Sequence, residues 1–174
     1  MMPGARMRIA IPRESRQPDL HALDLLAQLG AEVDRSEEAI TVTGPARLTG
    51  ARLDAEACPD AAVMLAVACA QARGASRIDG LHTLRVKETD RIHALASELA
   101  RTGCTVRELP DAIEIDPGTC TPGPIRVRTW NDHRIAMAFG ILGLVREGVS
   151  IEDPGCVGKS YPGFWTDRAR LVGG

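Results

Sequence analysis

Residues 27–33 read AQLGAEV and residues 100–106 read ARTGCTV, so one pattern of small, polar, glycine and apolar positions occurs twice. The central glycines, Gly30 and Gly103, are 73 residues apart. Three further pairs keep this register to within one residue: 39–42 with 112–115, 59–60 with 131–132, and 76–79 with 149–152. Several matches in one register indicate an internal repeat. The chain is therefore predicted to contain two copies of one unit, at about 8–75 and 76–174.

Each copy shows the same order of predicted elements. A short strand is followed by an amphipathic helix, two alternating strands, a further short strand and a second helix. The first helix carries apolar residues at helical spacing, and Gly30 or Gly103 follows its end as the C′ residue. The apolar residues are Leu20, Leu23, Leu26 and Ala27 in copy one, and Ile92, Leu95, Ala96 and Leu99 in copy two. The predicted strands are 8–12, 32–35, 39–43 and 51–54, then 76–79, 105–108, 112–116 and 125–128.

The second helix of each copy differs from the first. Residues 61–72 and 135–145 are apolar almost all round, and a helix that is apolar on every face is buried on every face. The predicted fold class is α/β (α+β), with repeated βαβαββ-type units, outer amphipathic helices and buried inner helices. No linker or low-complexity tract separates the copies, so we expect one body with strands around a central helical layer.

Composition excludes several classes of protein. The 174 residues carry a net charge of −2 and only 3% aromatic residues, which argues against nucleic acid as a partner. The apolar runs are shorter than the roughly 20 residues of a membrane-spanning helix, so we expect no membrane partner. Residues 1–8 do not form the charged and apolar leader of a secreted protein. Five cysteines without a CxxC pair favour the reducing cytoplasm over a disulfide framework.

Charged residues gather at the predicted helix starts. Asp60 follows Pro59 at the first inner helix, and Asn131–Asp132 precede the second, with His133 and Arg134 in its first turn. Residues 85–91, RVKETDR, open the second outer helix. For an aspartate in this position, capping is the ordinary explanation, because its carboxylate accepts backbone N–H bonds.

Cations at helix starts need another explanation. Lys87 and Arg91 are four residues apart on one predicted helix face, and Arg134 lies at a second helix start. Positive charge at a helix N-terminus opposes the helix dipole. A bound phosphate or carboxylate would reverse this effect, because helix N–H groups, Lys and Arg together bind anions. Each cation alone could be a solvated surface residue, but the set indicates an anion site.

Other candidate residues carry weaker signals. Lys159 lies in the glycine-rich segment 154–162, PGCVGKSYP, which lacks the first glycine of a phosphate-binding P-loop. His21 and His93 are predicted on the surface, and Cys69 in the core. No ligand spacing supports a metal site, so neither a metal nor an organic cofactor is predicted.

Two stretches resemble the signatures of the 5-enolpyruvylshikimate-3-phosphate (EPSP) synthase family: residues 84–91, LRVKETDR, and residues 131–138, NDHRIAMA. Residues 59–62, and 153–156 with Lys159, also fit the family pattern in order and spacing. The resemblance implies an inside-out α/β barrel in the enolpyruvyl transferase fold. It also implies transfer of the enolpyruvyl group of phosphoenolpyruvate to the 5-hydroxyl of shikimate 3-phosphate, without a cofactor. This step belongs to the shikimate pathway of aromatic amino acid biosynthesis, and the family is the target of glyphosate.

The resemblance also implies catalytic roles for three residues. Asp60 would bind the shikimate hydroxyls and accept the proton of the attacking 5-hydroxyl. Lys87 would assist this proton transfer and contact phosphoenolpyruvate. Glu88 would protonate the methylene carbon and later retrieve a proton when phosphate leaves. Addition of an alcohol across an enol ether needs such an acid and base.

Binding roles fall to five further residues. Arg91 and Arg134 would hold the carboxylate of phosphoenolpyruvate, Lys159 would lie on its phosphate side, and His133 would lie behind them. Thr83 stands where the family commonly has an amide side chain, so its contact with shikimate 3-phosphate departs from the pattern.

Family members are more than twice as long, and the resemblance covers a partial carboxy-terminal domain. A further amino-terminal domain or chain is therefore expected as partner, an apolar patch should be exposed, and this chain alone should be inactive. Two alternatives remain: a non-catalytic remnant or anion-binding module of the same fold, and another enolpyruvyl transferase such as the UDP-N-acetylglucosamine enzyme.

Overall fold

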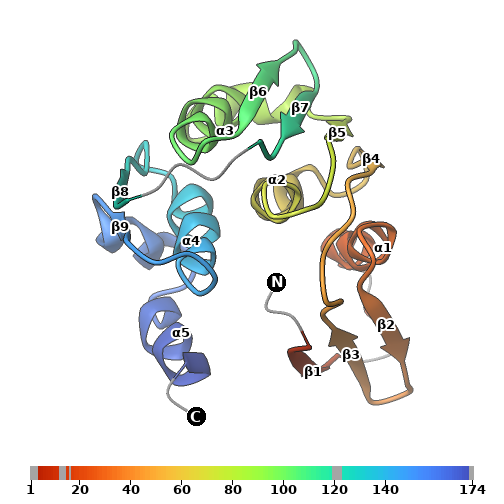
Figure 1. Cartoon of the computed structure of the whole chain (residues 1–174). Helices are drawn as coiled ribbons and strands as arrows, with labels where there is room; N and C mark the ends of the chain where they lie inside the picture. Colours follow the sequence, from red (N-terminus) through yellow and green to blue (C-terminus); the bar gives the residue numbers. More distant parts are fainter. Residues whose placement is uncertain (1–3, 12–14, 16, 119–122, 173–174) are drawn as a thin grey trace.

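Helices and strands follow one another around an arch in the computed structural model, which describes residues 4–11, 15, 17–118 and 123–172 (Figure 1). The strands are β1 Arg6–Ala10, β2 Glu32–Arg35, β3 Ala39–Thr43, β4 Arg52–Asp54, β5 Ser76–Asp79, β6 Thr105–Glu108, β7 Ile113–Asp116, β8 Ile125–Val127 and β9 Val149–Ile151. The helices are α1 His21–Gln28, α2 Ala62–Cys69, α3 Arg91–Ala100, α4 His133–Leu142 and α5 Phe164–Val172. β1 and α5 border the open side of the arch. None of these helices combines the length and apolarity needed to cross a membrane.

The three sheets connect successive parts of the chain. Their strand orders are β1-β3-β2, β4-β5-β7-β6 and β8-β9. Strands β2 and β3, like β6 and β7, form antiparallel pairs, whereas β4 pairs with β5, and β8 with β9, in parallel. The series β1-α1-β2-β3-β4-α2 thus has the same element order as β5-α3-β6-β7-β8-α4, and β9 and α5 begin that order again.

The observed elements lie close to the predicted ones, with differences at the ends. Strand β1 begins before the predicted 8–12, and Pro12 lies outside the described residues. Helix α2 is shorter than 61–72 because residues 70–72 form a turn, and α4 begins at His133, two residues before the predicted start. Helix α5 was not predicted, although Trp165, Ala169 and Val172 recur at helical spacing.

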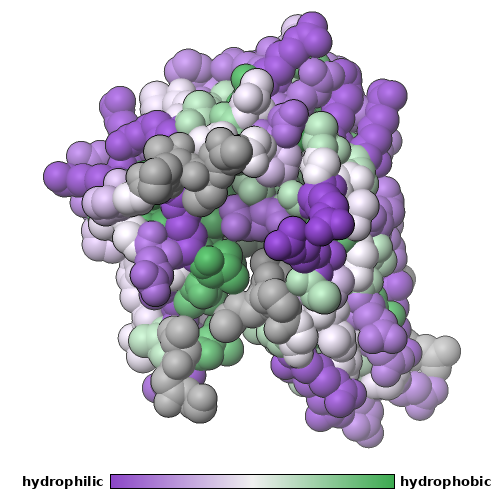
Figure 2. Space-filling model, viewed as in Figure 1, coloured by the Kyte–Doolittle hydropathy of each residue, from purple (hydrophilic) through white to green (hydrophobic). Residues whose placement is uncertain are grey.

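The core confirms the prediction of buried inner helices. Helices α2 and α4 lie side by side within the arch (Figure 1). Every residue of α2 except Met64 is buried, and α4 buries His133 and its apolar residues except the half-buried Met137 and Ile141. Figure 2 shows a mainly hydrophilic outer face and hydrophobic residues beside the central hollow, over the region of α4 and α5. Exposed hydrophobic side chains occur on β1, α2, α5 and just beyond α4: Met7, Ile9, Met64, Val145 and Leu171.

Helix α5 packs against α4 where α4 has a glycine. A Cβ atom added at Gly140 would lie 2.8 Å from the Trp165 ring and 3.1 Å from the Phe164 ring. We expect Gly140→Ala to lower the free energy of unfolding by about 1–3 kcal/mol, because the rings must move, although alanine favours helix. Urea unfolding measures this change. Gly158→Ala is the control, because no atom lies within 4 Å of its added Cβ. Equal stability of both variants would contradict this account of the α4–α5 contact.

Candidate active site

The candidate site is built from turns that precede the helices. Asp60 lies in the 3₁₀ turn Pro59–Ala61 before α2, and Arg134 lies in the first turn of α4. Glu88 lies between the 3₁₀ helix His82–Val86 and α3, whose first residue is Arg91. Lys159 ends the 3₁₀ helix Pro154–Lys159. Four segments that are far apart in the sequence, around residues 60, 88, 134 and 159, therefore meet in one place.

Two local predictions were wrong. The N-cap of α2 is Ala61, and the Asp60 carboxylate contacts cations from other segments instead of capping the helix. Lys87 does not share a helix face with Arg91, because its backbone is extended, with φ −89° and ψ −151°. Helix α3 begins only after Asp90, whose carboxylate accepts the N–H of His93 at 3.1 Å. An aspartate cap outcompetes a longer helix here, since it satisfies an otherwise unpaired N–H.

Arg91 is the centre of the site and is almost completely buried, at 1% exposed. Its Nε donates to Asp132 Oδ2 at 2.7 Å, and its Nη1 donates to Asp60 Oδ1 at 2.8 Å. Its Nη2 donates to Glu88 Oε2 at 2.7 Å. One planar guanidinium therefore holds three carboxylates from three segments, in the fork geometry that arginine provides.

Three further cations contact the same carboxylates. Arg134 Nη2 lies 3.0 Å from Asp60 Oδ2, and Lys87 Nζ lies 3.5 Å from Asp60 Oδ1. Lys159 donates to Glu88 from the other side, with a side chain that is 60% exposed. Lys87 and Lys159 are the two lysines of the whole sequence. The structure thus brings together the predicted residues Asp60, Lys87, Glu88, Arg91, Arg134 and Lys159.

The charges of this cluster do not cancel. Four cations face three carboxylates, the third being Asp132, which is 0% exposed. Because Arg91 already bonds all three carboxylates, the more accessible cations Lys87, Arg134 and Lys159 are the ones that an incoming anion can reach. Asp132 was predicted as a cap, which it is, but its bond to Arg91 was missed. A signal for this bond was available in the sequence: Asp132 begins a helix that was predicted to be buried, and a buried carboxylate requires a cation as its partner.

Thr83 and His133 each carry a buried atom without a hydrogen-bond partner. Among the described residues, Thr83 Oγ1 and His133 Nδ1 are the buried side-chain nitrogen and oxygen atoms in this condition. Thr83 was predicted to contact shikimate 3-phosphate, and His133 was predicted to lie behind the residues that hold phosphoenolpyruvate. Burial lowers the pKa of His133 below 6.5, so its ring is neutral at pH 7. Buried polar atoms are normally paired, so each of these two atoms has the capacity for one further hydrogen bond.

Glu88 is held as a carboxylate. The bond from Lys159, followed by a backbone bond and the charge of Arg91, lowers its pKa from 4.5 to about 2. Ionised Glu88 therefore stabilises the folded chain above pH 4.5, and this contribution is lost as the pH falls toward 2.

Removal of Lys159 should reverse much of this shift. In Lys159→Met we expect the pKa of Glu88 to rise from about 2 toward 4.5, because the strongest of its stabilising bonds is lost. A ¹³C NMR titration of glutamate carboxyl groups, assigned with Glu88→Gln, measures it. The control Lys87→Met removes the other lysine, which contacts Asp60 and not Glu88. A pKa that stays near 2 in Lys159→Met would contradict the assignment.

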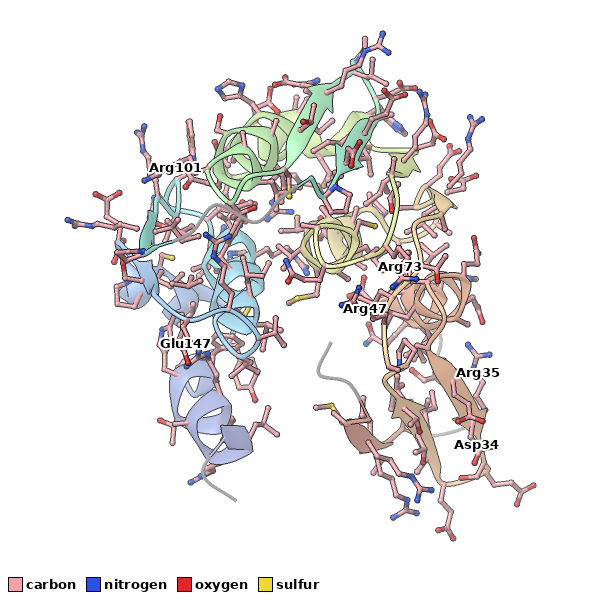
Figure 3. The ribbon with its side chains drawn as sticks, viewed as in Figure 1. Asp34, Arg35, Arg47, Arg73, Arg101 and Glu147 are labelled. Atoms are coloured by element: carbon pink, nitrogen blue, oxygen red, sulfur yellow. The ribbon has the colours of Figure 1, made fainter. Side chains whose placement is uncertain are left out.

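Another pair of cations lies away from this site. Arg47 and Arg73 lie close together and, with Gln71 and Asp116, line a pocket of about 470 Å³ (Figure 3). Arg73 follows the C-terminal end of α2, whereas Asp60 precedes its N-terminal end. A cation beyond a helix C-terminus complements the helix dipole, which gives Arg73 a structural explanation. Within the described ranges, no group of three or more His, Cys, Asp or Glu side chains is placed to hold a metal ion.

Comparison with known proteins decides the family. The family model for EPSP synthase (3-phosphoshikimate 1-carboxyvinyltransferase) matches residues 5–167. The chain belongs to the EPSP synthase family. The signature stretches that contain Lys87, Glu88, Arg91 and Arg134 lie inside the matched range, as do Asp60 and Lys159.

Relatives with known names agree with this family but are longer. The 3-phosphoshikimate 1-carboxyvinyltransferases of Nostoc punctiforme and Thermococcus kodakarensis are 39% and 45% identical to the chain, over 94% and 92% of its length. The matches cover 38% and 39% of those two proteins. The chain therefore spans about two fifths of the length of these relatives.

Solved structures confirm the predicted fold. The EPSP synthase of Acinetobacter baumannii aligns with 98% of this chain and 42% of its own, with a TM-score of 0.80 and 26% identity. The enolpyruvyl transferase NikO of Streptomyces tendae, at 23% identity and a TM-score of 0.69, shares the fold. The chain thus holds part of the α/β fold of the EPSP synthase family.

Proposed function

We propose that the chain supplies the carboxy-terminal part of an EPSP synthase active site, for transfer of the enolpyruvyl group of phosphoenolpyruvate to the 5-hydroxyl of shikimate 3-phosphate. The observation that carries the proposal is the convergence of three carboxylates and three further cations around the buried Arg91. The family relationship supplies the reaction. The proposed location is the cytoplasm, on the ground of the cysteine pattern in the sequence.

The geometry suits paired acid and base chemistry. Asp60 and Glu88 bond to the two terminal nitrogens of the same guanidinium, so Arg91 fixes the separation of the two carboxylates. Asp60 is the proton acceptor for the 5-hydroxyl, with Lys87 at 3.5 Å to assist. Glu88 is the donor to the methylene carbon of phosphoenolpyruvate. The oxygen then adds to the neighbouring carbon, and elimination returns a proton to Glu88 as phosphate leaves.

Glu88 must gain a proton before it can act as the acid. Its pKa of about 2 in the ligand-free chain results mainly from Lys159. A substrate phosphate competes with Glu88 for Lys159, whose side chain is the most exposed of the four cations. When Lys159 turns to the phosphate, the pKa of Glu88 rises, so anion binding itself prepares the acid.

The proposed activity needs a partner that completes the site. The chain spans about two fifths of its relatives, and half of a substrate cleft can neither exclude water nor hold two substrates. We propose that residues 8–75 and 76–174 hold two units of the carboxy-terminal domain, and that the amino-terminal part of such a relative completes it. Within the described part of the chain, β1 is an edge strand and has no parallel neighbour of the kind that β5 has in β4. This edge and the exposed Met7 and Ile9 offer a place for the partner.

The test measures phosphate release from phosphoenolpyruvate and shikimate 3-phosphate. We expect negligible turnover by the chain alone and turnover after addition of an amino-terminal fragment of the Thermococcus kodakarensis relative. No turnover with the fragment, together with anion binding, would favour an anion-binding module. Dependence on UDP-N-acetylglucosamine in place of shikimate 3-phosphate would favour the sister enzyme. Clear turnover by the chain alone would refute the need for a partner.

Binding can be followed without turnover. Because the chain has two lysines, both at the site, ¹⁵N-lysine labelling gives two ammonium signals. We expect phosphoenolpyruvate to shift the Lys159 signal, assigned with Lys159→Met. If neither signal moves at millimolar phosphoenolpyruvate, these residues do not bind it in the isolated chain.

A further inference from the structure

The turn that leads into α4 has an unusual backbone. Trp130 and Asn131 have positive φ angles of 56° and 55°, and the N–H of Asp132 donates to the carbonyl of Thr129 at 2.9 Å. Two consecutive positive φ angles characterise a type I′ turn, which favours Gly, Asn and Asp. Asn131 fits this preference, but a bulky tryptophan rarely adopts it. Such strain persists only where the surroundings hold the residue in place.

A buried glutamate on α3 holds this turn. Glu98 is 3% exposed. Its Oε1 accepts the indole N–H of Trp130 at 3.2 Å, and its Oε2 accepts the backbone N–H of Arg128 at 3.2 Å. The more exposed Arg101, at the end of α3, donates to Oε2 at 2.9 Å and offsets the charge (Figure 3). The glutamate thus bonds to the residue before the turn and to the first of its two strained residues.

The indole ring is held by two further contacts. His93 of α3 meets it edge to face, with ring centroids 5.5 Å apart. The Arg128 guanidinium lies 4.4 Å from the ring centroid, in the geometry of a cation–π contact. Trp130 is therefore bound to α3 through Glu98 and His93, although it belongs to the segment before α4.

The turn ends at Asp132, which joins it to the candidate site. One carboxylate oxygen of Asp132 accepts the N–H groups of Arg134 and Ile135, and the other accepts Arg91 Nε at 2.7 Å. We propose that Glu98 and Trp130 are positioning residues: together they hold the turn that places Asp132, and through Asp132 they orient Arg91 toward Asp60 and Glu88. The catalytic consequence rests on the proposed function, whereas the structural consequence does not.

Two variants each remove one of the contacts that hold the turn. Trp130→Gly suits positive φ but removes the indole, and Glu98→Gln replaces one acceptor oxygen by a donor. Arg101→Met is the matched control, because it removes a donor of Glu98 that does not reach the turn. Trp130→Phe, which keeps the ring and loses the N–H, serves if the glycine variant does not fold.

The first readout is NMR on the chain as it is. The Nε–H signal of Arg91 should be protected from exchange in wild type and in Arg101→Met. In Trp130→Gly and Glu98→Gln we expect at least tenfold faster exchange and a higher pKa of Glu88. The proposal is overturned if, in both variants, the Arg91 Nε–H exchanges as slowly as in wild type and the pKa of Glu88 is unchanged. The turn would then hold Asp132 without Glu98 and Trp130.

The second readout is turnover of the complemented protein. Misplacement of a catalytic group by about 1 Å costs on the order of 100-fold in rate. We expect kcat to fall tenfold to 100-fold in the two variants, with folded protein and a smaller change in KM. Wild-type kcat in both would overturn the catalytic part of the proposal. If the complemented wild type itself is inactive, the proposed function fails, and the Arg91 signal still decides whether Glu98 and Trp130 position the cluster.

Discussion

Arg91→Met is expected to lower the free energy of unfolding by about 3–5 kcal/mol, the usual cost of leaving a buried charge without its partner. Asp132 is 0% exposed and would lose the N–H that reaches its Oδ2 at 2.7 Å. Asp60 and Glu88 would also lose their shared donor, but both keep a lysine. The cost therefore arises mainly at Asp132. Urea unfolding followed by far-UV circular dichroism measures it.

Two controls test the cause of this loss. Arg107→Met removes an exposed ion pair with Glu114 at 3.4 Å and should cost less than about 1 kcal/mol. In the double variant Arg91→Met, Asp132→Asn the buried charge is gone, while asparagine still caps α4. We expect this double variant to be more stable than Arg91→Met alone. A loss in Arg91→Met no larger than in Arg107→Met would show that Arg91 does not hold the cluster.

The repeat explains why the position of the site was predictable. Both inner helices follow a short strand in the same way, so their N-termini lie at equivalent places in the two series of elements. Residues such as Asp60 and Arg134 at those starts are then brought together by the fold, whatever their individual roles. Hydrophobic periodicity located α1 to α4; Gly30 is the C′ residue of α1 as predicted, whereas Gly103 lies one residue beyond the C′ position of α3.

Local structure at the site was not predictable in the same way. The preference of aspartate for N-cap positions predicts Asp60 as the N-cap of α2, but the N-cap is Ala61. The carboxylate of Asp60 is stabilised more by three cations than by one backbone N–H. Equally, the pattern of residues 85–91 does not reveal that Lys87 is extended. The first outcome depends on residues from distant segments, which a local pattern does not contain, and the second follows from the Asp90 cap.

Trp130 shows the same limit more strongly. Tryptophan favours strands, and the preceding residues form β8, so the sequence favours an extended Trp130 rather than a left-handed one. The deciding contact is Glu98, which is 32 residues away in the sequence. Exceptions to local preference of this kind concentrate near functional sites, and here the exception lies two residues from Asp132.

In the complemented protein, Glu88→Gln is expected to lower kcat by a factor of about 10² to 10⁴, the usual contribution of a positioned acid or base. Glutamine keeps the size of Glu88 and an oxygen for the Nη2 of Arg91, so the cluster should remain folded. It has no titratable proton for the methylene carbon and cannot retrieve one as phosphate leaves. Steady-state phosphate release at saturating phosphoenolpyruvate and shikimate 3-phosphate measures the effect.

Glu108→Gln is the matched control. Like Glu88, Glu108 pairs with two basic side chains, here Arg85 and His93, but it lies outside the cluster around Arg91. Its kcat should stay within about twofold of wild type, since no proton passes through it. The two glutamates have lowered pKa values for similar reasons, so a general effect of lost charge would affect both variants alike. If Glu88→Gln retains wild-type kcat, Glu88 is not the acid. The proton must then come from another group, such as Lys87, whose Nζ lies 3.5 Å from Asp60 Oδ1.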